Sequence, residues 1–301
     1  PELQGLMGGK YLLEEGEPRD VALAVVEHYL PRGAGDALPA TPAGAVVALA
    51  ERLELLLSIF AKGERPTGSS DPYALRRAGN GVVQILWGMA WRLDLMAFLS
   101  NAVEEWAALF PAFAVDASQL HNDLCQLMRQ RIVSQLEDDG FAPDLVQAVA
   151  GDAVSSQRLL SDPLDVKQRI QLLRDLRDSG QLDAVQAVVQ RAAKLAEKGD
   201  LARDQLVAGE VVEPERFESA SEKDLFAALE QLQPLAKQRS YQALADALVA
   251  ATPALQAFFD GDTSVMVMVD DAALRLNRLN LLAVLRNQAS VLAEFESIQS
   301  K

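Results

Sequence analysis

Apolar residues return every three or four positions through most of this chain, which is the spacing of the buried face of an α-helix. The pattern is continuous over residues 46–60, 120–127, 166–176 and 185–195. These stretches are rich in Ala, Leu, Gln, Glu and Arg, all of which favour helix. The first stretch contains the series Val46, Ala50, Leu53, Leu57 and Phe60. The periodicity therefore predicts an all-α fold.

One short run resembles a β-strand. Residues 265–269 read Val-Met-Val-Met-Val and are followed directly by Asp270 and Asp271. Since Asp favours the position just before a helix, we interpret the run as a buried lead-in to the next helix rather than as part of a sheet.

Four places carry the sequence signals of a helix start. Asp71-Pro72, Asp162-Pro163 and Ala142-Pro143 each put a proline where a helix can begin, a position at which its missing N–H costs little. Residues 221–224 have the outline of a capping box. Longer interruptions, expected to be module joints or long loops, lie at residues 32–42, 63–70 and 209–220.

The charge balance limits how the chain can meet a nucleic acid. Its 28 Lys+Arg and 43 Asp+Glu residues give a formal net charge of −15, which argues against general, charge-driven binding. Half of the 301 residues are hydrophobic, so the chain can build large cores, and its length suggests two or three units.

The ends and the apolar runs bear on location. The chain starts at Pro1 without the basic and apolar segments of a signal peptide, so we expect the start to lie inside a longer chain. The longest apolar runs fall far short of the roughly 18 residues of a membrane span. The single cysteine, Cys125, fits a reducing compartment. Together these features predict a cytoplasmic protein with no membrane partner.

The sequence shows no catalytic constellation. The early glycines lack the Lys-Ser/Thr pair of a phosphate-binding loop, and neither Cys-x-x-Cys nor a histidine pair at ligand spacing occurs. His121 and Cys125 are four residues apart, which allows a nucleophilic pair or simply a surface histidine near a buried thiol. We favour the second interpretation, and we expect His28 to have a structural role at a helix end.

The segment from Arg65 to Ala78 reads RPTGSSDPYALRRA and is more specific than generic helical sequence. It resembles the β subunits of the bacterial two-subunit glycyl-tRNA synthetases, which read close to PTGSKDPFALRRAA there. Members of that family are considerably longer, so the resemblance implies a C-terminal portion. Further matching segments are Pro1–Gly8, Glu27–Arg32, Ala48–Glu54, Phe258–Asp260, Val265–Met268 and Leu274–Leu279.

The resemblance implies three helical modules. Residues 1–66 resemble the second half of an HD-type domain, residues 67–164 a helical body, and residues 165–301 an anticodon-binding bundle of the DALR type. In this family the α subunit carries the class II core that activates glycine with ATP, and we expect Mg²⁺ there too. The resemblance therefore implies no catalytic site and no cofactor in this chain. The implied partners are glycine tRNA and the α subunit, in an α2β2 assembly.

The HD-type likeness raises one enzymatic alternative. In active HD phosphohydrolases the helix that resembles residues 48–55 supplies a final metal-binding Asp, and the matching residue here is Glu51. The chain contains no His-Asp dipeptide, so any other ligands would lie upstream. We expect no metal site, and a residual metal phosphohydrolase is the less favoured alternative.

Contact with RNA requires Lys or Arg for phosphates and polar or planar side chains for loop bases. Arg275, Asn277 and Arg278 meet this requirement, and we expect them to project from one helix whose other side is buried. The alternative is that the two arginines pair with Asp270 and Asp271 across the preceding turn.

Further RNA candidates lie on other predicted helices. Residues 158–203 carry nine basic and seven acidic side chains, and Arg191, Lys194 and Lys198 are expected to share a helix face there, for RNA or simply for solvent. Arg76 and Arg77 follow a capped helix start, where they either face RNA or form a structural salt bridge. For the whole chain, the alternative is a helical protein scaffold for the α subunit with little RNA affinity.

Overall fold

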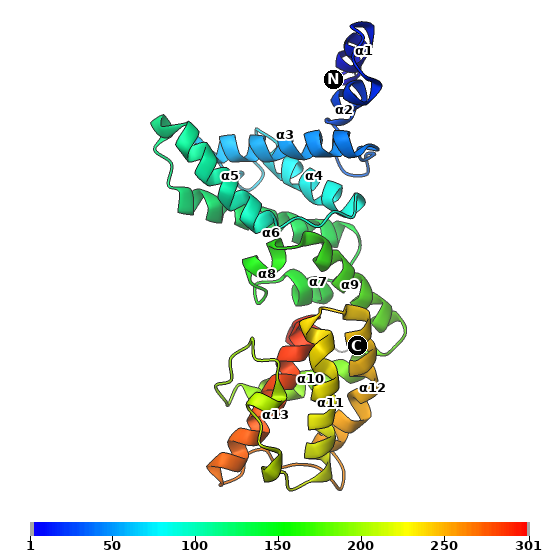
Figure 1. Cartoon of the computed structure of the whole chain (residues 1–301), viewed down its shortest axis with the longest axis vertical. Helices are drawn as coiled ribbons and strands as arrows, with labels where there is room; N and C mark the ends of the chain where they lie inside the picture. Colours follow the sequence, from blue (N-terminus) through cyan, green and yellow to red (C-terminus); the bar gives the residue numbers. More distant parts are fainter. Residues whose placement is uncertain (1–2, 300–301) are drawn as a thin grey trace. The chain divides into compact units, whose positions relative to one another are not determined.

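A computed structural model describes residues 3–299, and over that range the fold is all-α, as the periodicity predicts (Figure 1). The β-type pairing within these residues is a single bridge between Thr67 and Ser70. None of the helices described is long and apolar enough to cross a lipid bilayer. The helices are α1 (Leu6–Glu14), α2 (Arg19–Glu27), α3 (Pro42–Ala61), α4 (Leu75–Gly88), α5 (Leu95–Leu109), α6 (Ala117–Asp138), α7 (Pro143–Ala150), α8 (Ser156–Leu160), α9 (Pro163–Asp178), α10 (Leu182–Ala196), α11 (Ala220–Lys237), α12 (Tyr241–Phe259) and α13 (Ala272–Ser290), with short 3-10 turns η1 (Pro111–Phe113), η2 (Ala208–Glu210), η3 (Pro214–Arg216) and η4 (Phe295–Ser297).

The chain divides into two compact units, which we describe separately. The first unit comprises the chain up to Gly140 together with Val154–Lys167, and the second comprises Phe141–Ala153 and the chain from Gln168 onward. Helix α9 begins in the first unit and continues in the second. The division into three modules at residues 66 and 164 follows family likeness rather than compactness, and it stays a prediction.

In the first unit α3 is the central helix, since it packs against α2, α4 and α6. The Thr41 hydroxyl caps it by accepting a hydrogen bond from Gly44 N at 3.1 Å. Of the apolar face that the spacing predicts, Leu53 and Phe60 are buried, whereas Val46 is 56% exposed. One end of this face is therefore open to solvent.

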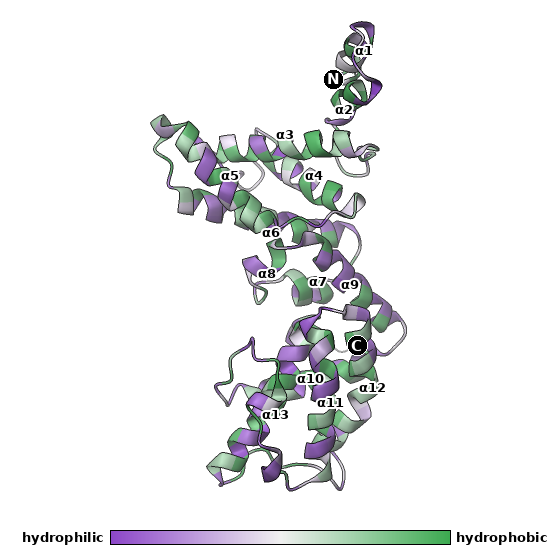
Figure 2. Cartoon of the chain, viewed as in Figure 1, coloured by the Kyte–Doolittle hydropathy of each residue, from purple (hydrophilic) through white to green (hydrophobic). Residues whose placement is uncertain are grey.

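In the second unit α13 is central and packs against α10 and α11 (Figure 1). Polar and apolar residues are mixed along α13 (Figure 2), and several of its polar side chains are buried. Asn287 Nδ2 donates to the carbonyls of Ala202 and Gln205 at 2.7 and 2.9 Å, and Gln288 Nε2 donates to that of Leu206 at 2.8 Å. Because buried carbonyls need donors, these amides hold the irregular segment after α10 against α13.

The predicted helix starts are mostly confirmed. Pro143 and Pro163 open α7 and α9. The capping box of α11 is made by Ser219 and Glu222, so the helix begins earlier than the predicted box at 221–224. The predicted interruptions fall, to within one residue, in the segments between α2 and α3, α3 and α4, and α10 and α11.

The strand-like run before α13 has no regular secondary structure. Asp271 caps the helix as expected, since its Oδ1 accepts hydrogen bonds from Ala273 N and Leu274 N at 2.9 and 3.0 Å. Val267 is buried, but Met266 is 74% exposed. The expectation of a buried lead-in is therefore correct for only part of the run.

Candidate functional site

The three α13 candidates lie mostly inside the second unit. Asn277 and Arg278 are each only 4% exposed. Arg278 donates from Nε to Glu222 Oε1 at 2.8 Å and from Nη2 to Glu218 Oε2 at 2.9 Å. The prediction that these side chains project from α13 toward RNA is therefore wrong for Asn277 and Arg278, because both are buried in the protein. The carboxylates that pair with Arg278 belong to the start of α11 and not to the turn before α13.

Arg275 and Asn277 also form hydrogen bonds within the chain. Asn277 accepts from Glu213 N at 2.7 Å and donates to Glu213 O at 3.1 Å, which fixes part of the acidic loop before α11. Arg275 donates from Nη1 to Val269 O at 2.6 Å, and its side chain is partly buried. Contact of these residues with RNA stays a prediction, and Arg275 is the one of the three that is not buried.

The α10 candidates differ in how far they are already engaged. Arg191 donates to Asp260 Oδ1 at 2.7 Å, and its guanidinium lies 4.7 Å from the centroid of the Phe259 ring. Lys194 is in the last turn of α10, whereas Lys198 lies two residues beyond its end, which corrects the single-helix prediction. Both lysines are exposed and neither has an acceptor among residues 3–299.

The other basic residues of segment 158–203 serve the fold. Arg169 is 1% exposed and donates to Leu292 O at 3.0 Å. Arg177 forms a two-pronged pair with Asp144, at 2.9 and 2.6 Å. The remaining four each contact a side chain of the same unit. The pairs are Arg158 with Asp165, Lys167 with Asp139, Arg174 with the ring of Phe141, and Arg203 with Glu294. The local positive balance of the sequence is therefore largely used inside the two units.

Arg76 and Arg77 lie in the first turn of α4. Asp71 caps this turn through a loop, with Oδ1 accepting from Leu75 N at 2.7 Å and Oδ2 from Arg76 N at 3.0 Å. The helix therefore begins at Leu75 and not at the proline after Asp71. The side chain of Arg76 lies near that of Arg131 on α6. Burial lowers the pKa of Arg131, and the positive charge of Arg76 lowers it further. The Arg77 guanidinium is exposed and has no acceptor in the described part of the chain.

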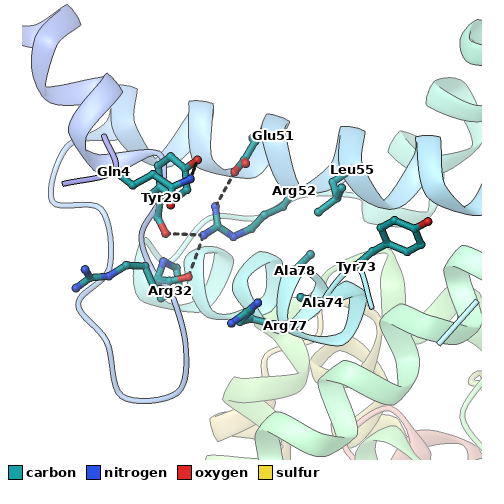
Figure 3. A pocket seen from close by; sticks show the side chains of 11 residues that line it. Gln4, Tyr29, Arg32, Glu51, Arg52, Leu55, Tyr73, Ala74, Arg77 and Ala78 are labelled. Carbon is teal, nitrogen blue, oxygen red and sulfur yellow. Dashed lines mark hydrogen bonds and ion pairs between the residues drawn. The ribbon is translucent and has the colours of Figure 1, made fainter. Parts of the chain in front are cut away.

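Arg77 borders a cavity of about 550 Å³ in the first unit (Figure 3). The cavity is lined by Gln4 just before α1, by the segment after α2, by α3 and by the residues around the start of α4. Tyr29 and Tyr73 contribute aromatic rings, and Leu55 and Ala78 contribute apolar surface. Its volume lies in the range of small-molecule sites.

Arg52 lines the same cavity although it is only 7% exposed. Its two terminal nitrogens donate to four backbone carbonyls, among them those of Tyr29 at 3.1 Å and Pro31 at 2.9 Å. Carbonyls solvate the guanidinium without neutralising it, and the Glu51 carboxylate is 3.7 Å away. Burial lowers the pKa of Arg52, and the charge of Glu51 raises it.

The residues considered for nucleophilic or metal chemistry lie elsewhere. No group of three or more His, Cys, Asp or Glu side chains is placed to hold a metal in residues 3–299. His121 Nε2 lies 3.5 Å from Cys125 Sγ, but burial raises the pKa of that thiol to about 11. The thiol stays protonated near neutral pH, which argues against a nucleophilic pair. His28 follows the last residue of α2, as predicted, with Nδ1 2.5 Å from Val25 O.

Sequence reasoning assigned no role to Arg52. Its partners Tyr29 O and Pro31 O are 23 and 21 residues earlier in the chain, so spacing does not reveal them. One signal was available, because Arg52 interrupts the buried face formed by Leu49, Leu53 and Leu56 on α3. A charge at such a position is rarely buried without specific partners.

Comparison with known proteins places the chain in a family. Residues 1–151 match the family model described as glycyl-tRNA synthetase beta subunit. The glycine–tRNA ligase beta subunits of Picosynechococcus sp. and Acaryochloris marina are each 46% identical to this chain over 304 residues, which cover 99% of it and 42% of each relative. That of Pseudomonas putida is 38% identical over 290 residues, covering 95% of this chain and 40% of the relative. The chain spans about two fifths of the length of these relatives, and it belongs to the glycyl-tRNA synthetase β-subunit family.

Proposed function

We propose that this chain is the tRNA-recognition and assembly portion of the β subunit of a bacterial glycine–tRNA ligase. In this proposal it contacts the anticodon arm of glycine tRNA in the cytoplasm. Glycylation, with its ATP and Mg²⁺, takes place on the α subunit of an α2β2 assembly. The observation that carries the proposal is the 46% identity to a glycine–tRNA ligase beta subunit over 99% of the chain.

Two exposed lysines support the RNA part of the proposal. A phosphate contact needs a Lys or Arg that is not already neutralised inside the protein. Lys194 and Lys198 meet this condition in the second unit, because neither has an acceptor among the residues described. With a net charge of −15, most of the surface repels phosphate. Binding should therefore be confined to a few places and fall steeply as salt rises.

Fluorescence anisotropy with labelled glycine tRNA and the full-length protein tests this proposal. Reversing both charges in Lys194→Glu/Lys198→Glu should weaken binding and reduce its salt dependence, because two phosphate contacts are lost. Lys237→Glu is the control, since Lys237 is an exposed lysine on α11 of the same unit. Equal affinities for glycine tRNA and an unrelated RNA, or equal effects of the two kinds of variant, would contradict the proposal.

An exposed aromatic cluster supports a second candidate, a scaffold that binds the α subunit with little RNA affinity of its own. Phe110 and Phe113 are 47% and 53% exposed, and their rings lie 4.9 and 5.1 Å from that of Trp106. The neighbouring Leu109 is 73% exposed. Contiguous apolar surface of this kind is typical of protein interaction sites.

Co-purification separates the two candidates. If the cluster binds the α subunit, Leu109→Asp/Phe113→Asp should release that subunit from the full-length protein without unfolding it, since both side chains are exposed. Retention of the α subunit with no measurable affinity of the complex for glycine tRNA would favour the scaffold over the RNA-binding role. Retention by the aspartate variant would exclude this cluster as the contact.

A further inference from the structure

We propose that the cavity beside Arg77 binds a nucleotide through its phosphate, whether the nucleotide is free or ends an RNA chain. The proposal rests on the charge of the cavity, its aromatic walls and its size. It goes beyond the tRNA contact proposed above and does not depend on it, because a free mononucleotide is sufficient to test it.

The lining of the cavity carries more positive than negative charge, although the protein as a whole is acidic. Arg77 contributes an exposed guanidinium that has no acceptor in the described residues. Arg52 contributes a buried charge whose terminal nitrogens donate to carbonyls. Among the lining residues Glu51 is the single carboxylate, and at 3.7 Å from Arg52 it offsets that charge in part. The balance of the three charges favours an anion.

A fourth charged residue at the rim does not change this balance. The Arg32 side chain points away from Arg52 (Figure 3). Its Nε donates to Asp36 Oδ2 at 2.9 Å, so the two opposite charges neutralise each other. The ligand must therefore be bound directly by Arg77. Arg52 attracts it only through its positive charge, because its terminal nitrogens already donate to carbonyls.

A phosphate suits this arrangement better than a simple carboxylate. The guanidinium of Arg77 presents a planar fork of donors that matches two phosphate oxygens at once. A phosphate monoester carries close to two negative charges near neutral pH, so it gains more from the Arg52 charge nearby than a monoanion does. Partial burial of the cavity strengthens both interactions relative to water.

The walls of the cavity identify the rest of the ligand as a nucleoside. Tyr29 and Tyr73 lie on opposite sides of Arg52 and Arg77 in Figure 3. Tyr73 is 37% exposed, and Lys62 Nζ lies 5.6 Å from the centroid of its ring. In this proposal the exposed part of the ring stacks on the base. A volume of about 550 Å³ accommodates a mononucleotide. The carboxylate of Glu51 supplies an acceptor for ribose hydroxyls.

Calorimetric titration of the full-length protein with AMP tests the proposal. Arg77→Ala should weaken AMP binding by about tenfold or more, the loss typical of a charged hydrogen bond. Arg19→Ala is the matched control, since Arg19 is exposed, lies in the same unit, has no acceptor among residues 3–299 and does not line the cavity. It changes the net charge equally and should leave AMP binding unchanged.

A base-free ligand tests the aromatic wall. Wild-type protein should bind AMP more tightly than ribose 5-phosphate, and Tyr73→Ala should remove most of that difference. A short RNA with a 5′-phosphate distinguishes the two sources of ligand. Tighter binding of the RNA than of AMP, with competition between them, supports an RNA end as the natural ligand, whereas AMP binding alone supports a free nucleotide.

Absence of AMP and RNA binding at millimolar ligand would overturn the proposal, as would equal effects of Arg77→Ala and Arg19→Ala. Its failure is distinguishable from failure of the proposed function. Glycine tRNA binding that depends on Lys194 and Lys198, without any effect of Arg77→Ala on AMP, rejects the cavity and leaves the tRNA role standing.

Discussion

Arg278 and Glu222 form an ion pair inside the second unit, with 2.8 Å between Nε and Oε1. The side chain of Glu222 is 0% exposed and that of Arg278 is 5% exposed. The other oxygen of Glu222 accepts from Glu218 N and Ser219 N, each at 2.8 Å. One buried carboxylate thus closes the capping box of α11 and joins that helix start to α13.

Glu222→Gln should therefore destabilise the protein strongly. The amide cannot accept at both positions, and it leaves the buried Arg278 charge without its closest partner. Removing one member of such a pair typically costs about 3–5 kcal/mol. Glu218→Gln is the control, because the Glu218 side chain is 66% exposed and its bond to Arg278 should contribute under about 1 kcal/mol. Urea unfolding followed by circular dichroism measures both, and equal losses would contradict the prediction.

The pair between Asp144 and Arg177 should make stability depend on acid pH. Hydrogen bonding to Arg177 lowers the pKa of Asp144 below its ordinary value of 3.8. The unfolded chain then binds its proton at higher pH than the folded one. The stabilisation is fully present above about pH 4 and is lost as pH falls through the folded-state pKa.

Asp144→Asn removes this dependence. The variant should be less stable than wild type at pH 7, and the difference should shrink as pH falls below 4. Asp260→Asn is the control, since the Arg191–Asp260 pair is 50% and 67% exposed and should contribute little at any pH. Thermal unfolding between pH 2.5 and 7 measures the difference. A gap between Asp144→Asn and wild type that stays constant across this range would count against the prediction.

Local sequence signals are sufficient to predict several of the helices. The three-and-four spacing predicts α3, α6, α9 and α10, because each buries one side against neighbours. The capping-box outline at residues 221–224 misplaces the start of α11, although the correct signal is present in the sequence. Ser219 and Glu222 are three residues apart, as a capping box requires.

The prediction that Arg278 and Asn277 are RNA contacts fails to foresee their burial, because their partners are far away in the sequence. Arg278 and Asn277 have the residue types of an RNA contact, but Glu222 and Glu213 are 56 and 64 residues away in the chain. Nothing in the spacing around α13 reveals that these partners bury them. The exposure of Lys194 needs no such information, because it follows from the local helical pattern, in which Glu197 is the nearest acid in sequence, three residues away.

The thiol of Cys125 should be unreactive in the folded protein. Burial raises its pKa to about 11, so the thiolate is scarce at pH 8, and the side chain is 5% exposed. Labelling with a chromogenic disulfide reagent should be slow in buffer and fast in denaturant. His121→Ala should leave the slow rate unchanged, since no ion pair with the histidine activates the sulfur. Rapid native labelling that His121→Ala abolishes would instead indicate a nucleophilic pair.

Gly81 on α4 should be intolerant of a side chain because Arg52 passes against it. A Cβ at this position would lie 2.4 Å from Arg52 Nε and 2.9 Å from its Cδ. Gly81→Ala must therefore shift a guanidinium that four carbonyls hold, and the loss of those bonds should outweigh the roughly 1 kcal/mol gained in helix propensity. We expect a net loss of about 1–3 kcal/mol in urea unfolding. Gly33→Ala is the control, because a Cβ there meets nothing within 4 Å, and it should change stability by under about 0.5 kcal/mol. A Gly81→Ala protein as stable as this control would show that Arg52 is not fixed in place.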